Sequence, residues 1–170
     1  MIVEPLFTKS LFRSDERGFL NKVLYKENRK SFIGESSIEE IFSTFSDQMG
    51  TIRGMHLQTS PENTIKLVWV THGAVLDVIV DLRIGSSYGK CISFELSSEN
   101  SYLAVIPQGF GHGFQTLKPN TVVNYATNYQ YKPEWDTGVK WDSLDFKWPL
   151  PPKKISMRDS SFIRIEDYSK

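Results

Sequence analysis

The three histidines of this 170-residue chain offer acid–base chemistry, and His56 has the most informative neighbours. It lies in TIRGMHLQ (residues 51–58), a strand-like stretch that also carries Arg53 and Gly54. Strict strand alternation sends Arg53 and His56 to opposite faces of a sheet. A bulge or twist at Gly54 brings the cation and the imidazole into one pocket. A shared site for the two side chains therefore depends on an irregularity at Gly54.

The other two histidines have different settings. His72 stands in a THG turn, where a solvated side chain is expected. His112 lies in IPQGFGHGF, where three glycines and a proline bend the backbone enough to aim a side chain into a concavity. The residues alone are consistent both with a structural His112 bonded to a backbone carbonyl and with a functional His112.

Several other kinds of site are disfavoured. A zinc or iron centre uses three or four grouped ligands, but Leu57 and Gln58 follow His56 where a second ligand is needed, so no metal is expected. Cys91 stands in an apolar strand and is predicted to be an inert buried thiol. Phosphate-binding glycine patterns are absent. The formal net charge is zero and no basic stripe interleaves the aromatic residues, so neither nucleic acid nor a membrane is an expected partner.

Strands must position these groups, because β-branched and aromatic residues come in short bursts broken by Gly, Pro, Asn and Ser. KLVWV and AVLDVIVDLR flank THG, which predicts a hairpin with Gly73 at positive φ. Alternation in VLDVIVDLR predicts that Asp77 and Asp81 face a polar cleft or solvent. The segments 24–32 and 36–42 are each expected to form one or two helical turns.

Composition predicts an all-β protein with one domain over residues 1–170. Eight prolines and eleven glycines are typical of a sandwich or jelly roll, and 39% hydrophobic residues suffice for one core. The proline-rich tail after Trp148 is expected to wrap around the body. With one cysteine, no apolar run of membrane-spanning length and no signal-peptide pattern, a cytoplasmic location is expected.

Nine short motifs occur in the order seen in one enzyme family, over roughly residues 15–160. They are DERGF, RGMHLQ, KLVWVTHGAVLDVIVDLR, LSSEN, IPQGFGHGF, NYATNYQY, VKWDS, WP and SMRD. By these motifs the chain resembles the dTDP-4-dehydrorhamnose 3,5-epimerase family. The resemblance implies a cupin-type jelly roll without metal or cofactor. It also implies a homodimer in which strands near the N-terminus reach toward the partner's active site.

The resemblance further implies roles for individual residues. His56 matches the base that removes a proton next to a ketone, and Asp159 in SMRD matches the carboxylate that orients this imidazole. Tyr125 in NYATNY matches an acid on the opposite face of the sugar ring. Lys66 supports the enolate oxygen, and Arg53 binds the diphosphate as a bidentate fork.

Further matches concern binding of the substrate. The resemblance places His112 in the same pocket and Tyr129 against the sugar or diphosphate, while Arg17 and Phe19 match positions that contact the nucleotide across a dimer. The chain departs from the family pattern in RGFLNK, where Lys22 replaces an acidic residue, and in IFSTF, where Ser43 stands at the place of an asparagine. These departures fall on the nucleotide side, so the catalytic pattern is retained while the nucleotide and the sugar stay open.

The expected activity is inversion of C3, C5 or both in a nucleotide-linked 4-keto-6-deoxy sugar, through an enolate. The alternatives are a sugar-nucleotide 3,4-ketoisomerase and a non-catalytic sugar-nucleotide binding protein, with a metal-dependent oxygenase as a distant third. A dTDP sugar or another nucleotide sugar is the expected ligand. Each residue taken singly also has a structural interpretation, such as a solvated strand end for Lys66, a packing aromatic for Tyr125 or a turn cap for Asp159.

Overall fold

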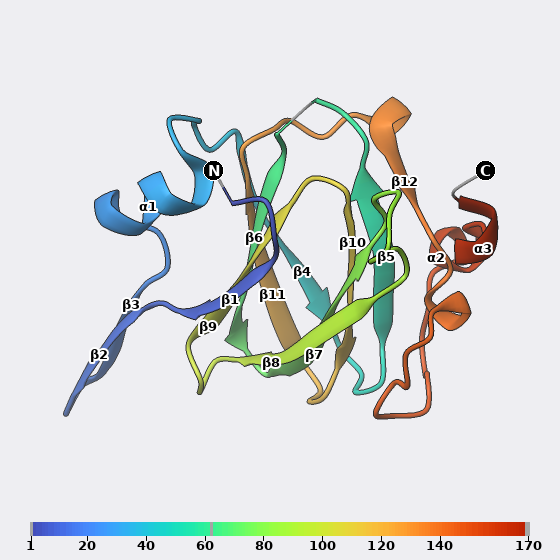
Figure 1. The fold of residues 1–170 in the computed structure, drawn as a ribbon. Helices are drawn as coiled ribbons and strands as arrows, with labels where there is room; N and C mark the ends of the chain where they lie inside the picture. Colours follow the sequence, from blue (N-terminus) through green and yellow to red (C-terminus); the bar gives the residue numbers. More distant parts are fainter. Residues whose placement is uncertain (1, 62, 169–170) are drawn as a thin grey trace.

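The chain folds mainly into short antiparallel strands (Figure 1). The computed structural model describes residues 2–61 and 63–168. The strands are β1 (Leu6–Lys9), β2 (Leu11–Asp15), β3 (Gly18–Lys22), β4 (Glu40–Ser46), β5 (Ile52–Gln58), β6 (Ile65–His72), β7 (Ala74–Asp81), β8 (Cys91–Ser97), β9 (Tyr102–Pro107), β10 (Phe110–Thr116), β11 (Thr121–Thr127) and β12 (Asp136–Gly138). The helices are α1 (Lys26–Ile33), α2 (Met157–Ser161) and α3 (Ile165–Tyr168), with 3-10 turns η1 (Pro133–Trp135) and η2 (Trp141–Ser143).

Two five-stranded sheets form the body of the molecule. The first sheet has the order β1-β9-β6-β11-β4, and the second has the order β12-β5-β10-β7-β8. Apolar side chains from both sheets fill the space between them: Val68, Val70, Val75, Ile79, Leu96, Ala104, Ile106, Phe110, Phe114, Val123 and Tyr125. The prediction of an all-β jelly roll with short helical segments is confirmed.

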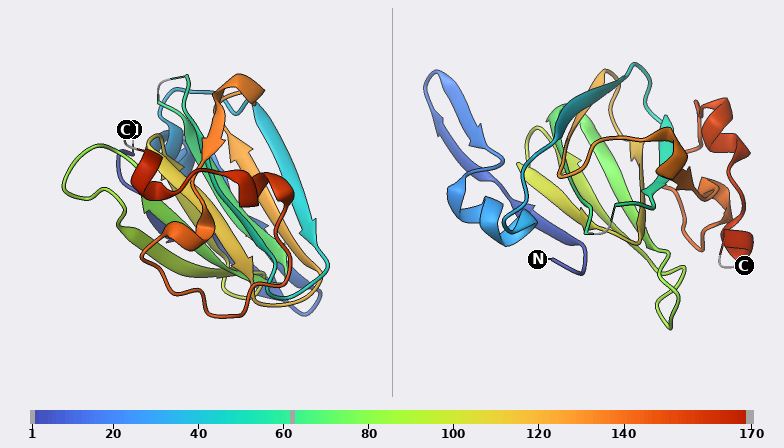
Figure 2. Two further views of the ribbon diagram at one scale, coloured as in Figure 1. Left: turned by 90° about the vertical axis from the view of Figure 1, so that its right-hand side faces the viewer. Right: turned by 90° about the horizontal axis from the view of Figure 1, so that it is seen from above.

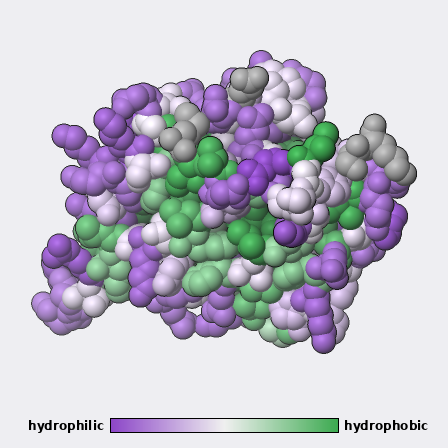
Figure 3. Space-filling model, viewed as in Figure 1, coloured by the Kyte–Doolittle hydropathy of each residue, from purple (hydrophilic) through white to green (hydrophobic). Residues whose placement is uncertain are grey.

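The sandwich is closed along one edge by aromatic residues. Phe7 of β1 stacks on Phe94 of β8, with 5.2 Å between ring centroids, and Phe94 also contacts Tyr102. β1 and β8 are the edge strands of their sheets, so these contacts join the two sheets there. Figure 3 shows apolar residues gathered across the middle of the corresponding face. The opposite edges, β4 and β12, leave the interior accessible.

Each sheet is covered on its outer face. Phe32 and Ile33 of α1 pack against Leu67 and Val105 on the first sheet. The C-terminal segment covers the second sheet, and the two coverings lie at opposite ends in Figure 2. Its buried contacts, which confirm the predicted wrapping of the tail, join Val139, Leu144 and Ile165 to Met55, Leu57, Val78, Val80 and Leu82.

The predicted β6–β7 hairpin is wrong. Gly73 does have positive φ, at 79°, but β6 pairs with β9 and β11, whereas β7 pairs with β8 and β10. The turn therefore carries the chain from one sheet to the other. A Cβ atom at Gly73 would lie 2.3 Å from Oγ1 of Thr121, so the crossing needs glycine for space as well as for φ. A hairpin turn and a crossing between sheets share the same strand–Gly–strand sequence pattern, so the sequence could not distinguish them.

Asp77 and Asp81 do not face solvent. Their side chains point to the interior face of β7, and the residues are 0% and 4% exposed. Burial is tolerated because each carboxylate has a cationic or hydrogen-bonding partner: Asp77 has His112 and Asp81 has Arg83. The mixed face of this strand therefore points inward because the C-terminal segment covers its other face.

One helical prediction is confirmed and one is wrong. Residues 24–32 overlap α1, whereas residues 40–42 of the segment 36–42 belong to β4. β4 pairs with β11 over seven residues, and this pairing outweighs the local helical preference. β2 and β3 form a separate hairpin that projects away from the sandwich (Figures 1 and 2). Among the described residues no helix is long and apolar enough to cross a membrane.

Candidate active site

A cavity of about 280 Å³, open to solvent, lies between the two sheets. This volume is near the lower end of the roughly 300–1,000 Å³ of small-molecule binding sites, which combine apolar walls with a few polar groups. Strands of both sheets and the C-terminal segment contribute to the lining: Glu40, Phe42, Thr44, Arg53, His56, Leu57, Gln58, Lys66, His112, Phe114, Tyr125, Thr127, Tyr129, Tyr131, Asp136 and Arg158.

His56 of β5 is paired with a carboxylate from α2. Its Nε2 lies 2.9 Å from Oδ1 of Asp159, whose Oδ2 accepts a hydrogen bond from the backbone N–H of Gly54 at 2.9 Å. Burial opposes ionisation of Asp159, but the hydrogen bonds from His56 and Gly54 outweigh it and hold its pKa below the usual value. An ionised Asp159 accepts the Nε2–H of a neutral imidazole, so the lone pair of His56 is on Nδ1.

The irregularity on which a shared Arg53–His56 site depends is present. In the pairing of β5 with β10, Arg53 lies opposite Phe114 and His56 lies opposite His112. These pairs are three residues apart on β5 but only two apart on β10, so β5 carries one extra residue, a β-bulge. Gly54 within this bulge has φ 121°, and a Cβ atom there would lie 2.7 Å from the carbonyl oxygen of His112. Arg53 and His56 consequently line the same cavity.

His112 and Lys66 bring further polar groups to the cavity. His112 is 2% exposed, and its Nε2 lies 2.7 Å from Oδ2 of Asp77, which is a carboxylate rather than the backbone carbonyl that was one expectation. Burial lowers the pKa of His112, against the attraction of Asp77, so the ring is neutral at pH 7. Burial also lowers the pKa of Lys66 to about 8, although Asp77 and Asp136 attract its charge. Lys66 is therefore still mostly an ammonium at pH 7.

Tyr125 is enclosed by other aromatic rings. Phe42 stacks on it with 4.7 Å between centroids and 10° between planes, and His112 meets it edge-on at 6.2 Å. Burial raises the pKa of Tyr125 well above its usual value, so its phenol is protonated through the physiological range. Tyr129 lines the same cavity, and burial raises its pKa as well.

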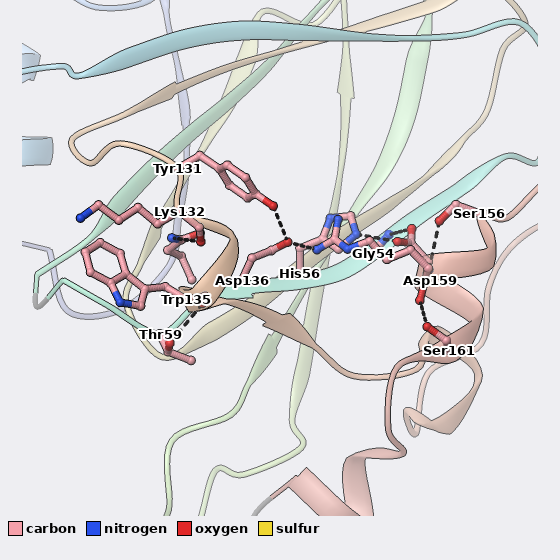
Figure 4. A network of polar contacts seen from close by, with 12 residues as sticks. Gly54, His56, Thr59, Tyr131, Lys132, Trp135, Asp136, Ser156, Asp159 and Ser161 are labelled. Carbon is pink, nitrogen blue, oxygen red and sulfur yellow. Dashed lines mark hydrogen bonds and ion pairs between the residues drawn. The ribbon is translucent and has the colours of Figure 1, made fainter.

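A polar network at the cavity was not predicted from the sequence. Arg158 forms an ion pair with Asp136, and the hydroxyl of Tyr131 donates to the same carboxylate at 3.1 Å. In Figure 4, Tyr131, Asp136, His56 and Asp159 follow one another across the view. Arg158 could have been suspected as the neighbour of Asp159 in SMRD, but no sequence signal marks Asp136.

The lining from β4 was also missed, for an identifiable reason. Glu40, Phe42 and Thr44 alternate along the strand and share one face. This period of two was the available signal, but the segment 36–42 was interpreted as helical. The head of Arg53 is bound to the same strand, through Nη2 to the carbonyl of Phe45 at 2.8 Å.

The structure gathers seven of the nine predicted site residues and leaves two apart. The seven are His56, Asp159, Tyr125, Lys66, Arg53, His112 and Tyr129. Arg17 and Phe19 lie instead on the projecting β2–β3 hairpin, where they line a different surface depression. The Arg17 side chain is 82% exposed and forms an ion pair with Asp15. Within one chain these two residues do not reach His56.

The described residues include no group of three or more His, Cys, Asp and Glu side chains placed to hold a metal ion. Cys91 lies outside the cavity lining. Burial raises the pKa of its thiol to about 11, which keeps it protonated at pH 7. The side chains at the cavity offer imidazole, phenol, ammonium, guanidinium and carboxylate groups.

Comparisons with known proteins agree with this fold and show the family of the chain. The family model described as dTDP-4-dehydrorhamnose 3,5-epimerase matches residues 2–167. The chain belongs to this family. It is 40% identical over 151 residues to the dTDP-4-dehydrorhamnose 3,5-epimerase of Sinorhizobium fredii, covering 86% of this chain and 77% of that protein. It is 37% identical to the enzyme of the same name from Methanothermobacter thermautotrophicus, over 88% of this chain and 79% of that one.

Solved structures of the dTDP-4-dehydrorhamnose 3,5-epimerase family share the fold. The Bacillus anthracis enzyme, described with TDP and PPi bound, superposes with a TM-score of 0.88 at 32% identity, over 95% of this chain and 94% of that one. A Legionella pneumophila 3,5-epimerase in complex with dTDP-4-keto-L-rhamnose gives 0.88 at 30% identity, over 98% and 90%. The predictions of the family, of an isomerase and of a cupin-type jelly roll are confirmed.

Proposed function

We propose that this protein inverts C3, C5 or both in a nucleotide-linked 4-keto-6-deoxy sugar by proton removal and return through an enolate. The observation that carries the proposal is the position of His56, which is hydrogen-bonded to Asp159 and lines one cavity together with Tyr125 and Lys66. A ketone at C4 acidifies the hydrogens on C3 and C5, because the carbanion delocalises onto the C4 oxygen.

His56 is the base in this proposal. Asp159 holds Nε2–H, which leaves Nδ1 free to take the proton from carbon. The same carboxylate stabilises the imidazolium that forms, as an ion pair that is only partly exposed: the His56 side chain is 29% and the Asp159 side chain 5% exposed. A positioned base of this kind contributes roughly 10²–10⁴-fold to the rate.

Lys66 stabilises the enolate oxygen. With its pKa lowered to about 8, it is a cation at pH 7 that is held in a largely water-excluded place. His112 lines the same cavity, but its one N–H is held by Asp77, so it contacts the sugar without donating a hydrogen bond to the enolate oxygen. The cost of charging Lys66 in this place is smallest when negative charge develops next to it, as in the enolate.

Tyr125 is the acid that returns the proton from the other face of the ring. Its raised pKa keeps the phenol protonated, and its contacts with Phe42 and His112 hold the ring orientation. Inversion requires the donor and the base to stand on opposite sides of the sugar, and they come from opposite sheets: His56 from β5 and Tyr125 from β11.

Arg53 binds the diphosphate, and Tyr129 contacts the sugar or diphosphate. The relatives crystallised with TDP and with dTDP-4-keto-L-rhamnose support a dTDP-linked substrate. We also propose that the protein works as a homodimer in which Arg17 and Phe19 of one chain contact the nucleotide in the partner's site. Their exposure on a projecting hairpin supports this arrangement.

Deuterium exchange tests the proposal. Incubation of dTDP-4-keto-6-deoxyglucose with the protein in deuterated water is expected to place deuterium at C3, C5 or both, with formation of the inverted sugar. Tyr125→Phe is expected to retain exchange while losing most of the inversion, because proton removal by His56 survives. An absence of exchange with the wild-type protein would leave only nucleotide-sugar binding and would refute the epimerase assignment.

A further inference from the structure

Phe42 is an apolar side chain in the cavity lining, and the mechanism above assigns it no chemical step. It stands on the edge strand β4, directly opposite Tyr125 of β11 in the strand register. The two rings stack face to face at 4.7 Å. Tyr125 is 7% exposed, but Phe42 is 44% exposed and lines the cavity. Part of its ring is therefore available to a ligand.

No other described residue of the cavity lining offers a comparable hydrocarbon surface. Leu57 and Phe114 also lack polar side-chain atoms, but they are 8% and 1% exposed and are occupied by core packing. Tyr131 is 50% exposed, but its hydroxyl is engaged with Asp136. An apolar group of a bound sugar thus has one extended surface to contact, the ring of Phe42.

We infer that Phe42 binds the C6 methyl group of the sugar and so selects 6-deoxy sugars over those that keep the C6 hydroxyl. This inference rests on the proposed function. In a 4-keto-6-deoxy sugar the methyl group is the one ring substituent without oxygen, and contact with an aromatic ring removes its surface from water at a gain. A hydroxymethyl group at the same place loses hydrogen bonds to water.

The same contact positions C5 for the reaction. The methyl carbon is bonded directly to C5, so a methyl group on the Phe42 ring brings C5 to the neighbourhood of Tyr125, on which that ring is stacked. Phe42 is therefore a specificity-determining and positioning residue, and the proton transfers remain with Tyr125 and His56. Hydrophobic sites reject an added hydroxyl only moderately, by roughly 100-fold.

The test compares two substrates in the same protein. The kcat/KM for deuterium incorporation at C5 is measured with dTDP-4-keto-6-deoxyglucose and with dTDP-4-ketoglucose, which retains the C6 hydroxyl. The wild-type protein is expected to prefer the 6-deoxy sugar by about 10–100-fold. Phe42→Gln is expected to reduce this preference to less than about threefold, and Phe42→Leu to keep most of it, because leucine preserves an apolar surface.

The ratio of kcat/KM for the 6-deoxy sugar to kcat/KM for the sugar with a C6 hydroxyl separates a role in recognition from a structural role. Loss of folded protein, or a change in the burial of Tyr125, alters the rates with both substrates alike and leaves the ratio unchanged. Ile41→Gln is the matched control, since Ile41 is the exposed apolar neighbour on the opposite face of β4 and lies outside the cavity lining. Its ratio is expected to equal that of the wild type.

Two results would overturn the inference while the epimerase assignment stands. One is a wild-type enzyme that exchanges both sugars equally well; the other is a Phe42→Gln variant that keeps the full preference. A wild-type protein that exchanges neither sugar would refute the proposed function, and the inference with it.

Discussion

His56 and Asp159 are 103 residues apart in the sequence, and their hydrogen bond converts two ordinary side chains into an oriented base. Asp159 is 4% exposed, so it has few competing water contacts. The carboxylate also accepts from the backbone of Gly54, within the bulge that directs His56 into the cavity. One residue therefore fixes both the position and the tautomer of the imidazole.

Removing the imidazole is the most direct test at this scale. His56→Ala is expected to lower the rate of deuterium exchange at both carbons by about 10²–10⁴-fold, because no other base has the same place. The measurement is NMR-detected incorporation from deuterated water. His72→Ala is the matched control, since His72 is exposed at the end of β6 and outside the cavity lining. Full exchange in His56→Ala would show that another group is the base.

Lys66 predicts a pH dependence. Because burial lowers its pKa to about 8, the ammonium loses its proton as the pH rises through 8, and kcat for exchange is expected to fall there. Lys66→Arg keeps its charge beyond pH 10, so this alkaline decline is expected to disappear from the activity that remains. If kcat of Lys66→Arg still falls near pH 8, the alkaline decline is caused by a group other than Lys66.

The lowered pKa of Lys66 affects stability in the direction opposite to its effect on catalysis as the pH rises. Between pH 8 and the ordinary lysine value of 10.5, the unfolded chain binds more protons at Lys66 than the folded one. The contribution of Lys66 to the free energy of unfolding therefore rises with pH in this window, while its contribution to catalysis falls. A partly buried lysine that costs stability at pH 7 is typical of a group retained for function.

At the scale of the elements, the bulge in β5 determines the site. Gly54 (φ 121°) and Gly113 let β5 and β10 approach closely: a Cβ atom at Gly54 would lie 2.6 Å from Cα of Gly113. This close approach keeps His112 opposite His56 and Phe114 opposite Arg53. Larger residues at these two positions would separate the strands and move His56 away from Tyr125.

A pair of alanine substitutions tests this role. Gly54→Ala and Gly18→Ala both place a side chain at positive φ, but a Cβ atom at Gly18 meets nothing within 4 Å. Gly54→Ala is therefore expected to lower the free energy of unfolding by about 1–3 kcal/mol more than Gly18→Ala does, as measured by urea denaturation. If the two variants lose the same free energy of unfolding, the cost comes from the positive φ alone and not from contact between β5 and β10.

At the scale of the whole molecule, the sandwich is closed at one edge and open at the other. Phe7 and Phe94 join the sheets where β1 and β8 meet, and the cavity opens where β4 and β12 end the sheets. The β2–β3 hairpin carries Arg17 and Phe19 away from this cavity. In the proposed homodimer the hairpin serves the partner's cavity instead.

Mixed dimers test this exchange of residues. Arg17→Ala is expected to raise KM for the nucleotide sugar with little change in kcat, because it removes a binding contact. In a mixed dimer of Arg17→Ala and His56→Ala chains, one site has an intact His56 and receives an intact Arg17 from its partner. The mixed dimer, purified with two different tags, is expected to regain the wild-type KM at half the wild-type kcat.

If Arg17 instead acts in the site of its own chain, the mixed dimer is expected to show no recovery of KM. Every site with an intact His56 would then lack its Arg17, and the mixed dimer would keep the high KM of Arg17→Ala. A protein that sediments as a monomer at assay concentration would also contradict exchange between subunits.

Local sequence determined the features that depend on near neighbours. Alternation and turn residues predicted the strands, the polar segment 24–32 predicted α1, and Gly73 was correctly expected at positive φ. The ordered motifs identified the family, because residue types at a site are set by the reaction. The need for an irregularity at Gly54 also followed from the chain itself, since alternation could not join Arg53 to His56.

Which distant segments meet was visible only in the folded chain. Whether the chain at Gly73 turns back or crosses to the other sheet depends on strands that arrive 18 or more residues later, and so does the burial of Asp77. The partner of His112 and the strand formed by residues 40–42 depend in the same way on long-range pairing. The physical reason is that packing between sheets outweighs local preference, and no local pattern records which partner a strand will find.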